Sequence, residues 1–370
     1  MKKLLLCVAA TGSCLTPVLS HADSPWFSLK EGNGFKRFST SVGWLHVMSQ
    51  GKANPYQITT PIAEGSKVAV GEASLESVRK SIDRSTPEGE KQYQKFESIV
   101  KTGEFLTLIK DGVLPANLSG ESIINGLSGW TAQGSGLEPD DIDTLGIMSK
   151  YHFTDNVAIE MKGGFPPKVD IKGKGKIIAP MTGTALPSGT SAFLGLGKMP
   201  LKNDILITDL DSYDVVSTAR AWTPAFEMHY QFGKTGVNKF RPYVGAGFMY
   251  AYFSEVKMDK GVKNDLLASA HMVQNLLDGK AGAALDHKTS SADLKVKLKA
   301  DDAFAPIVTA GFTYDFKENW FAVASVSYAK LSNDVTIDVI NKTTGQTLNH
   351  AETSIDVDPL LTYVGIGFRH

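Results

Sequence analysis

Apolar and polar side chains alternate most regularly at residues 222–232. The even positions are Trp222, Pro224, Phe226, Met228, Tyr230 and Phe232, and the odd ones are Thr223, Ala225, Glu227, His229 and Gln231. Alternation with a period of two residues predicts a β-strand with one apolar face. The run is longer than the roughly 5–6 residues of an ordinary globular strand. It therefore favours a strand that crosses a membrane.

Seven further segments alternate in a similar way. They lie at residues 38–49, 144–153, 157–171, 240–256, 304–316, 320–340 and 354–368. After the first residues of the chain, no window approaches the ~20 consecutive apolar residues that a transmembrane helix needs. An even number of strands can close on itself and leave no unpaired edge in hydrocarbon. We therefore predict an all-β fold, an eight-stranded antiparallel transmembrane β-barrel.

The connections between these strands alternate in length. Residues 154–156, 233–239 and 317–319 are short, whereas residues 51–143, 172–221, 257–303 and 341–353 are long. Outer-membrane barrels have short periplasmic turns and long extracellular loops. Helices are expected within the loops at residues 71–81, 90–110 and 263–277. The loops form either an extracellular cap that takes part in function or a solvated shield without a ligand role.

The first residues predict export. Lys2 and Lys3 precede apolar runs at residues 4–10 and 15–19, and small residues follow at 20–22. This order is typical of a secretory signal peptide, with cleavage expected after about Ala22. The chain then divides into a signal peptide at 1–22 and a single outer-membrane barrel domain at 23–370, with loop insertions at about 51–143, 172–221 and 257–303.

Composition narrows the function further. Both cysteines, Cys7 and Cys14, belong to the predicted signal, so the mature chain is expected to have no disulfide and no thiolate chemistry. The 38 basic and 39 acidic residues nearly balance. Without a broad cationic surface, we expect no binding of nucleic acid.

Several short motifs resemble the OmpW family of outer-membrane proteins, which includes the alkane-uptake protein AlkL. The clearest is Lys-Phe-Arg-Pro-Tyr-Val-Gly-Ala-Gly at 239–247, and the others, in the order of the family, lie at 43–47, at 154–157 with Glu160, at 165–168 and at 357–359. The resemblance implies an eight-stranded barrel associated with passage of small hydrophobic molecules across the outer membrane. The first loop, of about ninety residues, is far longer than in a compact family member.

This identification sets the expected partners. They are outer-membrane lipid and lipopolysaccharide, small hydrophobic solutes, periplasmic chaperones and the barrel assembly machinery. Nothing in the sequence suggests a cofactor or a metal site.

The lumen of an eight-stranded barrel is filled by side chains or holds one small ligand. If Val157, Ile159 and Met161 face lipid, strand parity turns their neighbours inward. The same rule gives the inward polar set Lys150, His152, Glu160, Lys162, Glu227, His229, Arg241 and Asp315. Buried charges need partners. The sequence therefore predicts a paired polar plug in the periplasmic half of the lumen.

Nearer the extracellular side, the inward positions are small or apolar. They are Met249, Ala251, Phe253, Val323, Ser325, Ala329 and Leu361. These residues either line the path of an apolar ligand or merely pack the barrel core. Proline cannot donate to a strand ladder. Pro166, Pro167 and Pro306 are therefore candidates for a lateral opening through which a ligand stopped by the plug could leave.

Two other functions compete with transport. Residues 330–333 lie nearest to the His-x-Ser-Asn pattern of barrel lipid A deacylases, but Lys330 stands where the histidine is required, so a lipid-modifying enzyme is not expected. The long loops also suit a structural or adhesive surface protein, or a receptor for phage or colicin. Faster uptake of apolar solutes into liposomes would separate transport from adhesion.

Overall fold

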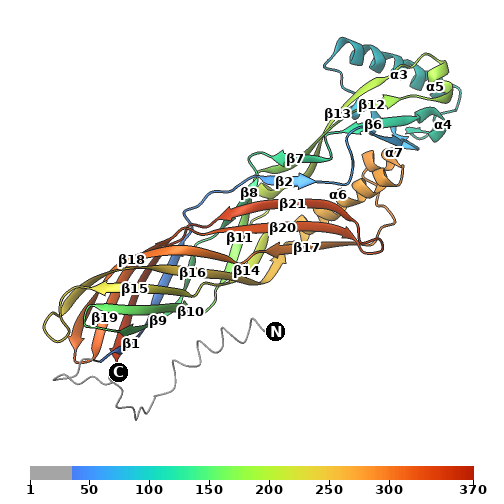
Figure 1. Ribbon diagram of the computed structural model, residues 1–370. Coiled ribbons are helices and arrows are strands. Elements are labelled where there is room, and N and C mark those ends of the chain that lie inside the picture. Colours follow the sequence, from blue (N-terminus) through green and yellow to red (C-terminus); the bar gives the residue numbers. More distant parts are fainter. Residues whose placement is uncertain (1–35) are drawn as a thin grey trace.

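The computed structural model describes residues 36–370, and the predicted signal peptide at 1–22 lies outside the described residues. Eight antiparallel strands close into a barrel in the order β15-β10-β9-β1-β22-β19-β18-β16, with β16 pairing back to β15, as predicted (Figure 1). The barrel strands are β1 (Phe38–Met48), β9 (Ile142–His152), β10 (Val157–Gly164), β15 (Ala225–Gln231), β16 (Phe240–Met258), β18 (Ala303–Lys317), β19 (Trp320–Ala329) and β22 (Leu360–Arg369).

Short turns gather at one end of the barrel, as predicted for the periplasmic side. They join β9 to β10, β15 to β16 and β18 to β19. The first and last described strands also meet there, because the His370 N–H donates to the Phe38 carbonyl at 3.0 Å. The outward alternation at residues 226–232 is confirmed too: Phe226, Met228 and Tyr230 are exposed, while Glu227 and His229 are buried.

Three predicted strands are broken in the structure. The segment 157–171 is divided between β10 and β11 (Lys168–Lys174), because two prolines interrupt it. The segment 320–340 is divided between β19 and β20 (Ser332–Asn341), and the segment 354–368 between β21 (Thr347–Asp356) and β22. The predicted loop at 341–353 is therefore mostly a hairpin of β20 and β21, because the alternation continues beyond the barrel.

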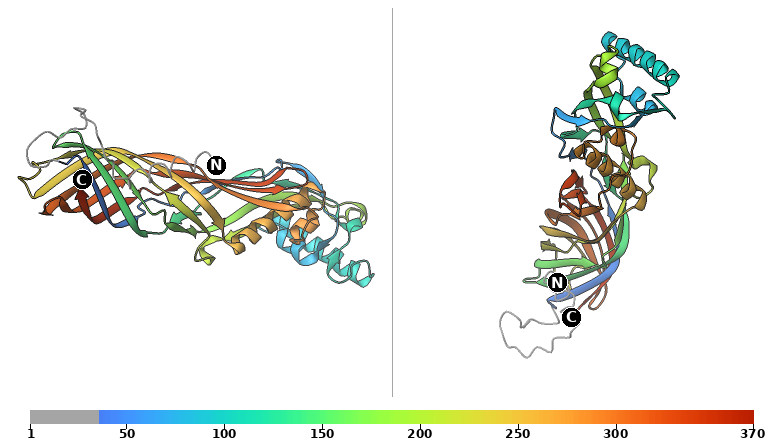
Figure 2. Two further views of the ribbon diagram at one scale, coloured as in Figure 1. Left: turned by 90° about the horizontal axis from the view of Figure 1, so that it is seen from below. Right: turned by 90° about the vertical axis from the view of Figure 1, so that its right-hand side faces the viewer.

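The long connections build an elongated extension on the barrel end opposite the short turns (Figure 2). Beyond β16 the barrel sheet continues through β14 (Ser217–Trp222), β11 and β8 (Gly136–Pro139). A second sheet has the order β17-β20-β21-β2-β7, with β17 (Leu294–Ala300), β2 (Tyr56–Thr59) and β7 (Gly129–Ala132). A third has the order β13-β12-β6-β3, with β13 (Met199–Asp209), β12 (Lys176–Leu186), β6 (Glu121–Asn125) and β3 (Ser66–Ala69).

Helices complete the extension, near the predicted positions. The longest are α3 (Pro87–Phe105) and α6 (Lys260–Leu277), and the shorter ones are α2 (Leu75–Ser81), α4 (Ala116–Ser119), α5 (Gly189–Phe193), the 3-10 turn η1 (Leu210–Ser212) and α7 (Ala281–Leu285), with the short strands β4 (Ala73–Ser74) and β5 (Val113–Leu114) beside them. Thr86 and Asp259 cap the first turns of α3 and α6 through their side chains. None of the described helices is long and apolar enough to cross a membrane.

The extension has hydrophobic cores of its own. The larger one joins α6 to β2, β12 and β20 through Leu266, Ile58, Ile177 and Ile337. A second core, farther along the extension, holds α3 through Phe96 and Val100. The insertions are thus folded structure with buried cores, which either a functional cap or a shield could have.

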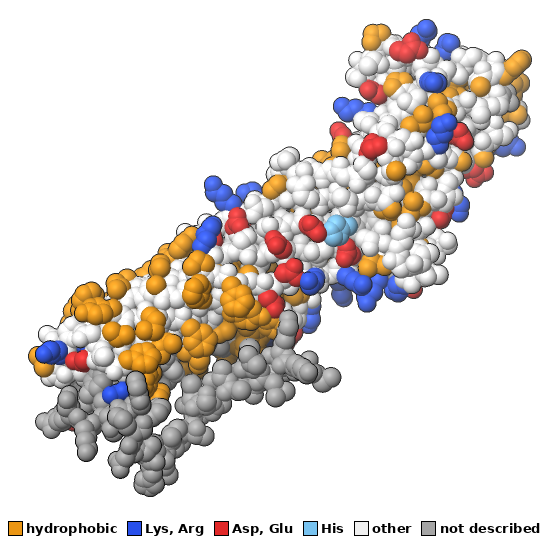
Figure 3. Space-filling model, viewed as in Figure 1, with side chains coloured by type: hydrophobic (Ala, Val, Ile, Leu, Met, Phe, Trp, Pro, Cys, Tyr) orange, Lys and Arg blue, Asp and Glu red, His pale blue; other side chains and the backbone are white. Residues whose placement is uncertain are grey.

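The barrel has an apolar outer surface. Figure 3 shows hydrophobic side chains gathered over its wall. The exposed hydrophobic residues of the barrel strands include Phe240, Phe304, Phe312, Val364 and Ile366. The extension carries more charged side chains on the same view. This distribution fits a barrel in hydrocarbon below an extension in water.

We expect the barrel to assemble without the first loop. Replacing residues 54–139 by a short turn leaves the β1–β9 ladder, from Phe38↔Tyr151 to Val47↔Ile142, untouched. The same change removes Tyr56 and Ile58 from the core of the extension. The variant should still migrate differently before and after boiling on detergent gels, and should bind more of a dye for exposed apolar surface. Loss of the unheated, faster species would show instead that the loop is needed for the barrel.

Candidate functional site

Two lysines and two glutamates meet inside the barrel. Lys162 Nζ lies 2.6 Å from Glu227 Oε1 and 3.9 Å from Glu160, and Lys150 Nζ lies 3.1 Å from Glu160 Oε2. Lys162 also donates to Thr309 Oγ1 at 2.7 Å and to Ser327 Oγ at 2.9 Å. All four charged side chains are buried. Because each charge faces an opposite one, the cluster satisfies the condition for burying ions.

A second polar layer lies next to the periplasmic turns. Arg241 contacts Asp155 at 3.5 Å and donates to the carbonyls of Phe232 and Gly233 at 3.3 and 3.2 Å. Arg369 donates to Asp315 Oδ1 at 2.8 Å. His152 and Gln231 are 3.3 Å apart, and Gln231 donates to Thr313 at 2.7 Å. This layer closes the lumen below the lysines and glutamates.

Aromatic rings cover part of the charge. Lys150 Nζ lies over the face of the Tyr243 ring, 4.1 Å from its centroid. The same ring stacks on His229 with ring centroids 4.9 Å apart. Glu227 Oε2 is 3.2 Å from His229 Nε2. Cations are attracted to ring faces, so Tyr243 adds to the stabilisation of Lys150.

The structure thus brings together Lys150, Glu160, Lys162, Glu227 and His229, and places His152, Arg241 and Asp315 in the layer beneath them. Sequence reasoning missed Asp155, Gln231, Tyr243 and Arg369, which complete these contacts. Strand parity would have turned Gln231 and Tyr243 inward, since they share the faces of His229 and Arg241. Asp155 lies in a turn and Arg369 follows the last predicted strand, so parity alone does not reach them.

Above the ions the lumen is apolar. Met249, Ala251, Ala329 and Leu361 are buried in one cluster, against which Phe253 packs. Residues not expected from the sequence complete that cluster, among them Ile307, Ala305 and Leu331. Side chains fill this part of the lumen, so a solute could pass only by displacing apolar groups.

Two residues expected in this upper group lie elsewhere. Val323 belongs to a separate cluster with Tyr243, Phe321 and Tyr363. Tyr243 lies against Lys150 and Phe321 against Arg369, so Val323 is at the level of the charged side chains. Ser325 is buried and belongs to neither apolar cluster. Strand tilt explains the shift, because inward residues of different strands at equal sequence offsets do not share one level of a tilted barrel.

The barrel wall is interrupted beside Pro166 and Pro167. The β10–β15 ladder ends at Lys162↔Ala225, and pairing resumes only where the Ala221 N–H donates to the Pro167 carbonyl. No ladder pair joins residues 163–166 to residues 222–224 within the described chain. Gly164 and Thr223, which the alternation would turn inward, are both exposed. At this point no ladder pair joins the neighbouring strands, and the residues that would face the lumen are small.

Pro306 lies at a different kind of place. Its strand keeps an unbroken register with β16 from Phe240↔Tyr314 to Ala251↔Ala303. On its other side, the Lys330 N–H donates to the Pro306 carbonyl at 3.1 Å, and pairing between β18 and β19 ends. Ala305 and Leu331 fill that edge with buried side chains. The strand pairing is therefore interrupted more fully at Pro166 and Pro167 than at Pro306.

Comparison with known proteins gives a consistent match. Residues 281–370, which contain β18, β19 and β22 of the barrel, match the model of the OmpW family. Outer membrane protein W of Vibrio cholerae serotype O1 is 21% identical over 225 residues, which are 61% of this chain and 72% of that protein.

Solved structures of outer-membrane proteins are also similar. The outer membrane protein OprG from Pseudomonas aeruginosa has a TM-score of 0.46 and 13% identity, over 90% of this chain and 95% of that one. Outer membrane protein W from Escherichia coli has a TM-score of 0.30 and 15% identity, over 90% of this chain and 98% of that one.

Proposed function

We propose that this chain, which matches the OmpW family model over residues 281–370, is an outer-membrane barrel that carries small hydrophobic molecules across the outer membrane. A solute enters the lumen from the extracellular side, passes the apolar cluster around Met249 and Leu361, and leaves sideways into the bilayer.

The observation that carries this proposal is the interruption of the β10–β15 ladder beside Pro166 and Pro167. β10 ends there at Gly164, two residues beyond Lys162, which forms the last ladder pair. Two charged pairs flank this edge: Lys162 with Glu227 at the end of the ladder, and Arg220, which donates to the Pro166 carbonyl at 3.1 Å, with Glu255. An apolar solute would leave between these pairs, past the exposed Gly164 and Thr223, into lipid.

Passage straight down is the unfavourable alternative. A solute would have to separate Lys162 from Glu227 and Lys150 from Glu160, and then the arginine contacts beneath them. Breaking a buried ion pair costs on the order of 3–5 kcal/mol, because it leaves uncompensated charge in low dielectric. A solute that moves the apolar side chains of the upper lumen aside breaks no ion pair and leaves no charge uncompensated. The sideways route is the one that the energetics favour.

Uptake into liposomes tests the proposal. We expect proteoliposomes to take up a small alkane or monoaromatic solute faster than protein-free liposomes, and a sugar of similar mass no faster, because the polar layers leave no aqueous pore. An enzyme trapped in the liposomes and acting on the apolar solute reports its arrival. The same protein denatured before reconstitution is the control.

Equal rates with and without folded protein would contradict transport. In that case the folded extension would favour the alternative, a structural or adhesive surface protein.

A further inference from the structure

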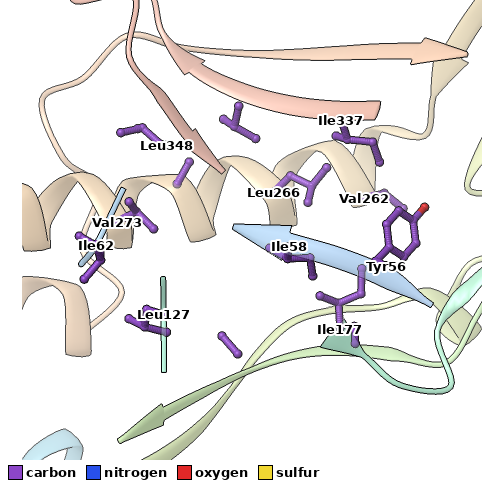
Figure 4. Close-up of a cluster of buried hydrophobic side chains, with 14 of the residues drawn as sticks. Tyr56, Ile58, Ile62, Leu127, Ile177, Val262, Leu266, Val273, Ile337 and Leu348 are labelled. Carbon is purple, nitrogen blue, oxygen red and sulfur yellow. The ribbon is translucent and has the colours of Figure 1, made fainter. Parts of the chain in front are cut away.

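A cavity lies in the extension, away from the barrel lumen. It has a volume of about 160 Å³ and lies between α6, the sheet that contains β12 and β13, and the sheet that contains β2 and β20. Ile58, Ile177, Leu266 and Ile337 are among its lining residues, and Figure 4 shows them in the surrounding cluster of buried side chains. Natural cores contain few voids larger than a water molecule, so a space of this size is unusual.

The lining excludes charged and strongly polar ligands. No lysine, arginine, aspartate or glutamate among the described residues lines the cavity, and most of the lining is aliphatic. Met181, Met258 and Met272 are also part of it, and methionine side chains adapt their shape to a ligand. The lining also includes Asn203, His287 and Asn349, but polar side chains are few against the aliphatic ones, so an ion would lose most of its hydration here.

One polar group in the lining is unused. The indole N–H of Trp130, which lines the cavity, is buried and has no hydrogen-bond partner in the described part of the chain. Buried donors are nearly always paired. A ligand with a single hydrogen-bond acceptor could satisfy it without any change in the apolar lining.

We propose that this cavity is a binding site for one small apolar molecule, of about the size of benzene, with room for a single acceptor group. An engineered apolar cavity of about 150 Å³ in another protein stays dry and binds benzene or xenon, so the volume and lining seen here are sufficient. Leu137 in β8 and Met258 in β16 line the cavity and belong to the sheet that continues from the barrel. Binding at the site is independent of transport, whereas its use as a first stop on an uptake route rests on the proposed function.

Xenon binding tests the site directly. Full-length protein with labelled Ile, Leu and Val methyl groups is placed in detergent micelles and titrated with xenon. The methyl signals of Ile58, Leu266 and Ile337 should shift and saturate. Val42 and Val364 face the micelle, so their shifts should rise without saturation.

Filling the cavity provides the variants. Ala179→Leu and Ser269→Leu each add volume at lining positions, and each should weaken xenon binding at least tenfold. Ala132→Leu is the matched control, because Ala132 is buried in the same core but does not line the cavity, and it should bind xenon like the unchanged protein. Having two filling variants keeps the test valid if one of them unfolds.

Two results would overturn the site: no saturable shift at Ile58, Leu266 and Ile337 in the unchanged protein, or a saturable shift that survives in a folded filling variant. Xenon binding with no liposome uptake would leave the site standing and contradict only the proposed function. Uptake without xenon binding would contradict the site and leave the proposed function standing.

Discussion

Glu227→Ala is expected to lower the free energy of unfolding by about 3–5 kcal/mol, because it leaves Lys162 buried with its nearest carboxylate removed. Lys162 would keep only Glu160 at 3.9 Å and two hydroxyl groups. His229 loses its contact with the same carboxylate. Unfolding in urea, followed in a detergent or lipid that allows refolding, measures the change.

Two controls separate the buried pair from a general effect of losing charge. The double variant Glu227→Gln with Lys162→Met removes both ions and keeps similar volumes, so it should recover most of the lost stability. Glu76→Gln breaks an exposed pair with Lys80 on α2 and should change nothing measurable. If Glu227→Ala is no less stable than the double variant, the ions are not held as a buried network.

Met249→Asp and Leu361→Asp are expected to slow uptake of an apolar solute at least tenfold. Both side chains are buried in the apolar cluster above the ions, and a tenfold change needs only ~1.4 kcal/mol of added barrier. A carboxylate in that cluster has no partner and binds water that the solute must displace. Uptake by proteoliposomes, normalised to folded protein on unheated gels, gives the rate.

Volume-conserving changes at the same positions serve as controls. Met249→Leu and Leu361→Met keep the surface apolar and should leave uptake within about twofold, since such exchanges disturb packing little. Unchanged uptake in folded Met249→Asp and Leu361→Asp would show that the upper lumen is not the path.

The period-two pattern was enough to find the barrel. It identified every barrel strand and the short turns, because lipid outside and a filled lumen inside force side chains to alternate. It also placed Glu160, Lys162, Glu227 and His229 on inward faces. Alternation does not show where a strand leaves the barrel wall. It therefore predicts β10 and β11 as one strand.

The sheets of the extension could not be predicted from alternation along the chain. Its sheets pair segments far apart in the chain, such as β2 with β21 and β12 with β6, and such pairings leave no local pattern. The helices were found because α3 and α6 have caps and apolar spacing of their own. The cavity could not be foreseen at all, because it depends on how α6 and two sheets fit together.

Closing the interrupted wall tests the central claim most directly. Residues 36–370 contain no cysteine, so the exposed positions Phe165→Cys and Thr223→Cys can be joined by a bis-methanethiosulfonate linker that a reductant removes. Val42→Cys with Ile366→Cys, an exposed register pair on the continuous wall between β1 and β22, is the matched control.

We predict that the linker across Phe165→Cys and Thr223→Cys slows uptake of an apolar solute at least tenfold, that reductant restores it, and that the control pair has no effect. Unchanged uptake in protein shown by mass spectrometry to be fully cross-linked at these two positions would contradict a sideways exit at this place.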